Sequence, residues 1–301
     1  MTKLTRLLGI LSALLALLAL LSFQARSADA DGKALLWEVT SPTTTVYLLG
    51  TIHVGSDRLY PLPAAIETAY ARSAVIALEA DPTDASALMS VGSTMYQPPD
   101  GLDQHVPAAL YRDAQARMAA TGLPGEIARM MKPWLLSMTL TMAEMGRLGF
   151  DAGRGIDLYL ATRARQDGKR LVELESMAMQ IALLDSLSPE LQTAMLQSTV
   201  DGLKSGSLGA DMTAMVEAWR RGDAVGLDEL AQKDLASSGG AAANELRARL
   251  YDQRNRAMSD RIRGLLAGRE IVMVAVGAGH MTGPTGITTL LAAKGYKVRR
   301  L

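Results

Sequence analysis

Two of the three histidines in this 301-residue chain share one short sequence pattern. His53 in GTIHVG and His280 in GAGHMTG each stand three residues after a glycine that ends a strand-like apolar run. With 27 glycines in the chain, two of three histidines show this spacing by chance in roughly 2% of cases. Imidazole nitrogens commonly bind divalent transition metals, so the pair indicates a metal or catalytic site. His105 lacks the pattern and is predicted to be a structural or surface residue.

Acidic side chains end two further strand-like runs. Glu79 ends VIALE, and Glu173 and Glu175 belong to LVELE. In open α/β sheets, ligands bind beyond the carboxyl ends of the strands. We therefore expect these carboxylates to reach the same sheet edge as the two histidines, although one member of the Glu173/Glu175 pair can be a solvated edge residue.

Together these side chains have the chemistry of a hydrolytic metal centre. Two imidazoles and a carboxylate suit Mn, Co or Zn, so His53, His280 and Glu79 are the predicted metal ligands. Their donor atoms should lie within about 5 Å of one point, since metal–ligand bonds are about 2.0–2.2 Å long. A metal lowers the pKa of bound water toward about 7, and a carboxylate can then accept the proton. Glu79 is a candidate for either a ligand or a general-base role, and Glu173 or Glu175 can supply a further carboxylate.

Three other polar residues stand in predicted helices. Arg254 and Asn255 can orient a carboxylate or a substrate carbonyl, which makes them candidate substrate-binding residues. Asp157 stands at a helix start, where capping of free N–H groups is the favoured interpretation. Both GxxH histidines are expected in loops beyond strand ends, so truncation of either is expected to leave no core cavity.

The elements around these residues predict an α/β fold. Strand-like runs occur near both ends of the chain and once in the middle, with periodic apolar segments typical of helices between them. We predict a mixed-sheet core built from N- and C-terminal strands, with a large helical insertion over 84–168 and 185–266. The predicted strands are 34–40, 45–49, 74–81, 169–176, 270–276 and 296–301, and one long helix is predicted at 244–266.

The first 30 residues have the features of a secretory signal peptide. Basic residues precede an uncharged Leu/Ala-rich run at 7–23, and small residues follow at 28–30. We expect cleavage near Ala30, a single mature domain at 31–301, and a periplasmic or secreted protein. An uncleaved membrane anchor is the alternative, because 17 apolar residues approach spanning length. The next apolar run, 134–145, is too short to span and is predicted to be a buried helix.

Charge and cysteine content narrow the classes of partner. Removing three basic and one acidic residue from 31 of each leaves 28 and 30, a net charge of −2. This balance gives no support for nucleic-acid binding. The chain has no cysteine, so stability must come from the core and not from disulfides. The sequence leaves the oligomeric state open.

Several motifs resemble the TraB/GumN family, which includes the Tiki metalloproteases that act on Wnt. The matching stretches are GTIHVG, ALEAD, GIDLYLATRARQDGK, LES with Gln180, RN with Met258, and VGAGHMTGPTGI. The resemblance runs in order from about 35 to 301 and implies an EreA/ChaN-like α/β fold with a metal-dependent hydrolytic centre. Carried over, it implies that His53, His280 and Glu79 form the metal centre. Glu175 is a lesser candidate, as a second catalytic residue beside Glu79, and Arg254 and Asn255 are lesser candidates for substrate binding.

These observations favour an exported metal-dependent hydrolase, with a peptide or protein as its substrate. Two alternatives stay open. One is a protein that binds haem or iron through the histidine pair, and the other is a catalytically inactive accessory protein of envelope or exopolysaccharide assembly. The substrate, the bond cleaved and the metal are not determined by the sequence.

Cleavage of the N-terminal segment can be tested directly. We expect the mature protein to begin near Asp31, because 1–30 has the charge, apolar core and small-residue end of a signal. N-terminal sequencing of the exported protein is the measurement. Membrane-bound material that begins at Met1 would support the uncleaved anchor instead.

Overall fold

The computed structural model describes residues 34–84, 86–237 and 240–301. Within these residues the chain forms two compact units. The helical unit consists of Asp84–Phe150 and Met177–Thr213, and the sheet unit consists of 34–83, Asp151–Ser176 and Ala214–Leu301. The predicted signal peptide lies outside the described residues, and the single mature domain stays a prediction. Every predicted site residue belongs to the sheet unit.

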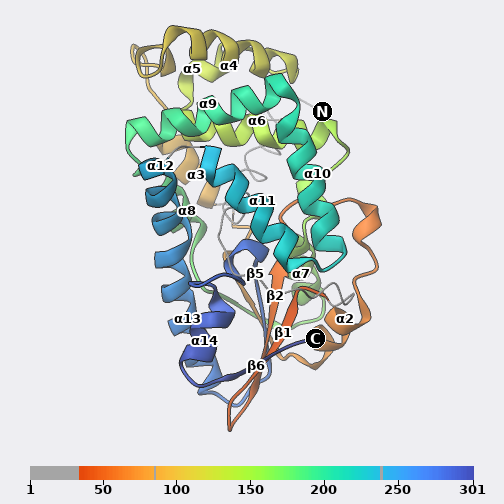
Figure 1. Cartoon of the computed structure of the whole chain (residues 1–301). Helices are drawn as coiled ribbons and strands as arrows, with labels where there is room; N and C mark the ends of the chain where they lie inside the picture. Colours follow the sequence, from red (N-terminus) through yellow and green to blue (C-terminus); the bar gives the residue numbers. More distant parts are fainter. Residues whose placement is uncertain (1–33, 85, 238–239) are drawn as a thin grey trace. The chain divides into compact units, whose positions relative to one another are not determined.

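A six-stranded mixed sheet forms the centre of the sheet unit (Figure 1). Its strands lie in the order β4-β3-β5-β2-β1-β6, so strands from both ends of the chain are neighbours. This confirms the predicted α/β class and the sheet built from N- and C-terminal strands. The strands are β1 (Leu36–Thr40), β2 (Thr45–Thr51), β3 (Val75–Leu78), β4 (Arg170–Glu173), β5 (Val272–Gly277) and β6 (Lys297–Arg300).

The antiparallel half of the sheet begins with the predicted hairpin. β1 pairs with β2 from Leu36↔Leu49 to Thr40↔Thr45. Ser41 closes the turn, because its hydroxyl accepts hydrogen bonds from the backbone N–H groups of Thr43 (3.2 Å) and Thr44 (3.0 Å). β6 then pairs antiparallel with β1, and its alternating exposure is that of an edge strand.

The parallel half of the sheet positions the candidate site. β2 pairs parallel with β5, β5 with β3, and β3 with β4. All residues of β3 and β5 are buried, as expected for central parallel strands with both faces covered. Because the four strands are parallel, their carboxyl ends meet at one edge of the sheet, as predicted.

Helices on both sides of the strands cover the sheet. In Figure 1, α13 and α14 lie to the left of the strands, and α2 and α7 lie to the right. The helices of this unit are α2 (Ala64–Arg72), α7 (Ile156–Gln166), α11 (Ala224–Ser237), α12 (Gly240–Arg247), α13 (Gln253–Leu266) and α14 (Ile287–Ala293), with α10 (Ser207–Arg220) shared between the units.

The long helix predicted at 244–266 is interrupted. A π-helical segment, η5 (Ala248–Asp252), separates α12 from α13. The apolar periodicity of this stretch does not distinguish an α-helix from one with a wider turn, so the interruption could not be predicted from the sequence. π-Helical turns often occur at functional sites, and η5 directly precedes Arg254 and Asn255.

The helical unit follows from ordinary helix signals. Pro189 begins α9, the Ser188 hydroxyl accepts a hydrogen bond from the Leu191 N–H at 3.3 Å, and Gly206 ends the helix with φ 77°. The run at 134–145 is the largely buried interior of α6, which confirms the prediction of a buried helix. The helices are α3 (Ser86–Ser93), α4 (Ala108–Ala120), α5 (Ile127–Met130), α6 (Pro133–Arg147), α8 (Met177–Asp185) and α9 (Pro189–Ser205).

Among the described residues, none of the helices has the length and apolar character needed to cross a membrane.

Close packing around Gly155 gives a test of this fold. A Cβ at Gly155 would lie 2.3 Å from the His53 carbonyl oxygen, so the Gly155→Ala variant must displace the segment that carries His53. We expect destabilisation by about 2 kcal/mol or more, measured as the free energy of unfolding in urea. Gly264→Ala in α13 is the control, because a Cβ there meets nothing within 4 Å and alanine favours a helix. Equal stability of the two variants would contradict the packing.

Candidate active site

His53 lies directly beyond β2 and is held by Asp157. Its Nδ1 lies 2.7 Å from Asp157 Oδ2, and Asp157 Oδ1 accepts a hydrogen bond from the Thr51 hydroxyl at 2.6 Å. The Ile156 N–H donates to the Ile52 carbonyl at 2.9 Å, which places the start of α7 against the GTIH segment. An ionised carboxylate only accepts hydrogen bonds, so Nδ1 carries the proton and Nε2 of a neutral His53 presents its lone pair.

His280 follows β5 and is held by Asn255. Its Nδ1 lies 2.5 Å from Asn255 Oδ1, while Asn255 Nδ2 donates to the Thr285 carbonyl at 2.9 Å. The amide orientation requires His280 Nδ1 to donate, so Nε2 presents its lone pair here as well. The ring is fully buried and packs against Tyr251, with the ring centroids 5.0 Å apart.

Both Nε2 atoms are buried, and neither has a hydrogen-bond partner among the described residues. Such buried nitrogens are uncommon in native proteins, because each forfeits the solvation it had in water. A charge on His53 adds to the stronger effects of burial and Arg254, which lower the pKa of His280. In their neutral forms the two histidines therefore present two buried nitrogen acceptors.

A buried arginine joins the two glutamates. Arg254 Nη2 lies 2.5 Å from Glu79 Oε1 and 2.6 Å from Glu175 Oε2, and Arg254 Nε also donates to Glu175. Arg254 Nη1 donates to the Leu250 carbonyl in η5 at 3.1 Å. Glu79 Oε2 accepts from the Gly277 N–H at 2.9 Å, and Glu79 Oε1 is 3.9 Å from His280 Nε2.

Backbone hydrogen bonds fix the two glutamates beyond their strands. The Glu79 N–H donates to the Ala275 carbonyl at 2.9 Å, and the Glu175 N–H donates to the Glu79 carbonyl at 2.8 Å. These bonds continue the parallel ladders past the last paired residues of β3 and β4. The side chains of Glu79 and Glu175 are therefore placed by the sheet itself.

Burial and neighbouring charges set the ionisation of the centre. Burial raises the pKa of Glu79, but the charges of Arg254, His280 and His53 and the Gly277 hydrogen bond together outweigh it, and the pKa falls to about 2. Burial and then Arg254 lower the pKa of His280 to about 3. Burial lowers the pKa of His53, yet the charge and hydrogen bond of Asp157 leave it above its usual value. Glu79 is thus an anion and His280 is neutral at physiological pH.

The sequence matches the TraB/PrgY/gumN family over residues 35–300. The chain belongs to this family. It is 26% identical over 248 residues to the uncharacterized protein YbaP of Escherichia coli (strain K12), an alignment covering 81% of this chain and 87% of that protein. An uncharacterized protein of Treponema pallidum (strain Nichols) is 23% identical over 279 residues, 85% of this chain and 80% of that protein. No solved structure matches the chain significantly.

In this member of the TraB/PrgY/gumN family, some of the predicted site residues contact one another. Glu79 contacts Arg254 and approaches His280, and Arg254 contacts Glu175. Among the described residues, no group of three or more His, Asp and Glu side chains is arranged to hold a metal ion. The two imidazoles nevertheless fit a metal in donor chemistry, because each presents Nε2 while a side chain fixes Nδ1.

Two expectations from the sequence are wrong. Asp157 does not cap α7: Gly155 is the N-cap residue, and the Asp157 carboxylate binds Thr51 and His53 instead. His280 is not in an open loop, because its residue is fully buried, and its truncation would leave a cavity. The sequence could not reveal either contact, since both depend on segments that are distant along the chain.

Other predicted residues lie where the sequence placed them or acquire more specific contacts. His105 is an exposed residue that bonds to Asp100 and stacks on Tyr96. Glu173 is the solvated member of its pair and accepts from the Asp81 N–H at 2.7 Å. Arg254 and Asn255 contact the glutamates and His280, and a direct role in substrate binding stays a prediction.

Tyr251 and Thr51 were missed as site residues. Tyr251 belongs to η5 and is four residues before Asn255, a helical spacing that could have indicated a shared face. Thr51 is inside the GTIH motif, but a threonine carries no catalytic signal by itself. Its hydrogen bond to Asp157 is the contact that orients this carboxylate toward His53.

The low pKa of His280 predicts acid sensitivity. Between the ordinary value of 6.5 and the native value of about 3, the unfolded chain binds a proton that the folded chain does not, so stability falls as pH falls. Protonation of Glu79 lowers the stability further only below its ordinary pKa of 4.5. The raised pKa of His53 changes the stability only above pH 6.5, where stability falls as pH rises. The window from pH 6.5 to 4.5 therefore isolates His280, with a slope of about 1.4 kcal/mol per pH unit.

Urea unfolding at several pH values in chelator measures this slope. His280→Asn should flatten it, because the Asn amide can donate to Asn255 without titrating. His105→Asn, at an exposed histidine, should leave the slope as in the wild type. An unchanged slope in His280→Asn would contradict a neutral buried His280.

Proposed function

We propose that this chain is an exported metal-dependent hydrolase whose substrates are peptides or proteins. The observation that carries the proposal is the pair of buried Nε2 atoms of His53 and His280, which have no hydrogen-bond partner among the described residues. Metal-binding histidines usually donate their other ring N–H to a carboxylate or carbonyl group. Asp157 and Asn255 hold Nδ1 of the two rings in this way.

The charge of the surroundings supports a cation at the histidines. The formal charges of the four side chains that contact the histidines or one another, Glu79, Asp157, Glu175 and Arg254, sum to −2. A divalent cation matches this charge in magnitude, and an uncompensated buried charge is costly. The raised pKa of His53 is the response of a titratable group to the same negative surroundings.

Each residue has a distinct part in the proposal. His53 and His280 bind the metal, which when bound supplies a nucleophilic water at neutral pH. Arg254 holds Glu79 ionised beside His280, and a pKa of about 2 favours Glu79 as a ligand or charge partner over a general base. The general-base role of Glu175 stays a prediction.

A haem- or iron-binding protein is the second candidate. The same two imidazoles could bind iron, and an apolar pocket flanks His53. Haemin titration distinguishes this candidate, because binding of haemin through His53 would shift the haem absorption band and a His53→Ala variant would lose the shift. The third candidate, an inactive accessory protein, predicts that neither metal nor haemin binds.

Metal binding and activity should depend on the histidines and their partners. We expect Mn²⁺, Co²⁺ or Zn²⁺ to activate hydrolysis of a peptide library by 31–301, and chelator to abolish it. His53→Ala and His280→Asn should remove measurable metal binding in calorimetry, because each removes one of two imidazole ligands. Asp157→Asn should weaken metal binding by about 10–100-fold, as other second-sphere changes do.

His105→Ala is the matched control and should change neither metal affinity nor activity. Thermal melts in chelator separate loss of ligand from loss of fold, since a folded His53→Ala variant that binds no metal supports the ligand role. Full metal-dependent activity in His53→Ala would exclude the proposed centre.

A further inference from the structure

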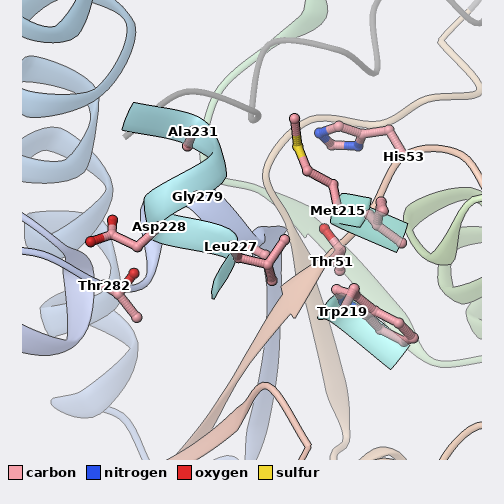
Figure 2. Close-up of a pocket in the computed structure, with 11 residues that line it drawn as sticks. Thr51, His53, Met215, Trp219, Leu227, Asp228, Ala231, Gly279 and Thr282 are labelled. Atoms are coloured by element: carbon pink, nitrogen blue, oxygen red, sulfur yellow. The ribbon is translucent and has the colours of Figure 1, made fainter. Parts of the chain in front are cut away.

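A pocket opens directly beside His53 in the sheet unit (Figure 2). Its empty volume, which includes open solvent at the mouth, is about 440 Å³. Six of its lining residues are aliphatic, aromatic or thioether side chains from four segments of the chain. The lining consists of Thr51, Ile52, His53, Met215, Trp219, Leu227, Asp228, Ala231, Ala278, Gly279 and Thr282.

The base of the pocket is made by the two GxxH segments themselves. Thr51 to His53 come from the first motif, and Ala278 and Gly279 come from the second. The motifs pack tightly, since a Cβ at Gly50 would lie 3.1 Å from Ala278 Cα. A ligand in this pocket therefore contacts the same backbone that positions His53 and His280.

One wall is fixed to the sheet. Trp219 of α10 donates its indole N–H to the Gly50 carbonyl at 2.7 Å, so its ring is held against the end of β2. Figure 2 shows Met215 and Trp219 on the side of His53, while Asp228 and Thr282 lie on the opposite side. The wall beside His53 is thus apolar and positioned, and the polar groups stand at the far side.

We propose that this pocket receives an apolar side chain, of leucine or methionine size, from the substrate residue next to the bond that is cleaved. The inference rests on the proposed function, because it places that bond at the histidines. Met215 and Leu227 give an apolar surface, and the unbranched methionine can adapt to side chains of different shape. Pockets of this kind combine apolar lining with a few polar groups that set specificity.

The apolar lining gives the pocket a preference against acidic side chains. Asp228 is only 8% exposed, and Figure 2 shows its carboxylate directed away from Leu227, Met215 and His53. An acidic substrate side chain would be desolvated among the apolar lining residues, which disfavours its ionised form. We therefore expect Leu and Met to be preferred, Gly to be accepted weakly, and Asp to be rejected.

A peptide series tests the preference. Peptides that differ only in the residue next to the cleaved bond should show kcat/KM at least about tenfold higher for Leu or Met than for Gly. Leu227→Ala should enlarge the pocket and shift the preference toward Phe. Ala231→Phe should fill the pocket and lower the rate for Leu more than that for Gly.

Leu230→Ala is the matched control. Leu230 lies on the same helix as Leu227 and is similarly half-buried, but it is not among the residues that line the pocket. The control should keep the wild-type preference, and thermal melts should show that all three variants are folded. An unaltered preference in both folded pocket variants would overturn the assignment.

A binding experiment without metal tests the pocket independently of catalysis. The chain has three tryptophans, so the indole N–H signals in a ¹H–¹⁵N spectrum are few and Trp219→Phe assigns the relevant one. N-acetyl-leucinamide should shift the Trp219 signal, whereas N-acetyl-glycinamide and the aspartate analogue should not.

The two experiments separate the possible failures. Metal-dependent cleavage without side-chain preference, together with an unmoved Trp219 signal, would overturn the pocket assignment and leave the proposed function intact. A leucine-specific shift in a chain that cleaves no peptide would support the affinity of the pocket for apolar side chains and overturn the proposed function.

Discussion

The guanidinium of Arg254 lies between the carboxylates of Glu79 and Glu175, and the arrangement of the centre depends on this contact. Removing one partner of a buried ion pair typically costs about 3–5 kcal/mol, because the remaining charge is left uncompensated. The same cluster orders its neighbours: Glu79 accepts from the Gly277 N–H at the start of GAGH, and Arg254 donates to Leu250 in η5. Three strands and one helix are therefore connected through a single cation.

The two imidazoles have partners of different charge. His53 donates to the carboxylate of Asp157, whereas His280 donates to the neutral amide of Asn255. A carboxylate partner makes an imidazole a stronger base and a stronger electron donor, while an amide partner fixes orientation with little change in basicity. Burial lowers the pKa of both rings; the charge and hydrogen bond of Asp157 reverse this effect for His53, whereas Arg254 adds to it for His280. The pair is thus unequal even though both residues come from the same sequence pattern.

The sequence predicted the positions of the chemical groups better than their partners. Glycine-terminated apolar runs place His53 and His280 at strand ends, and the parallel pairing of β2 with β5 brings those ends together. The position of a strand end follows from the local sequence pattern, and the meeting of two strand ends follows from the rules of sheet topology. The sequence could therefore predict where the two histidines lie. The contact of Asp157 with His53 joins segments more than 100 residues apart. The burial of His280 depends on packing against Asn255, which is 25 residues away along the chain. The apolar periodicity around η5 is that of an ordinary α-helix, so the π-helical turn could not be predicted from the sequence.

The central place of β5 has a consequence for how the protein matures. β5 lies between β3 and β2, which are not paired with each other, and its pairing with β2 joins Val46 to Val272 across most of the chain. Contacts of such sequence separation form slowly, because the loop between them must first be closed. A chain emerging from the ribosome can complete neither the sheet nor the histidine pair until β5 has been made. The candidate site is therefore assembled only late in folding, after the C-terminal part of the chain has become available.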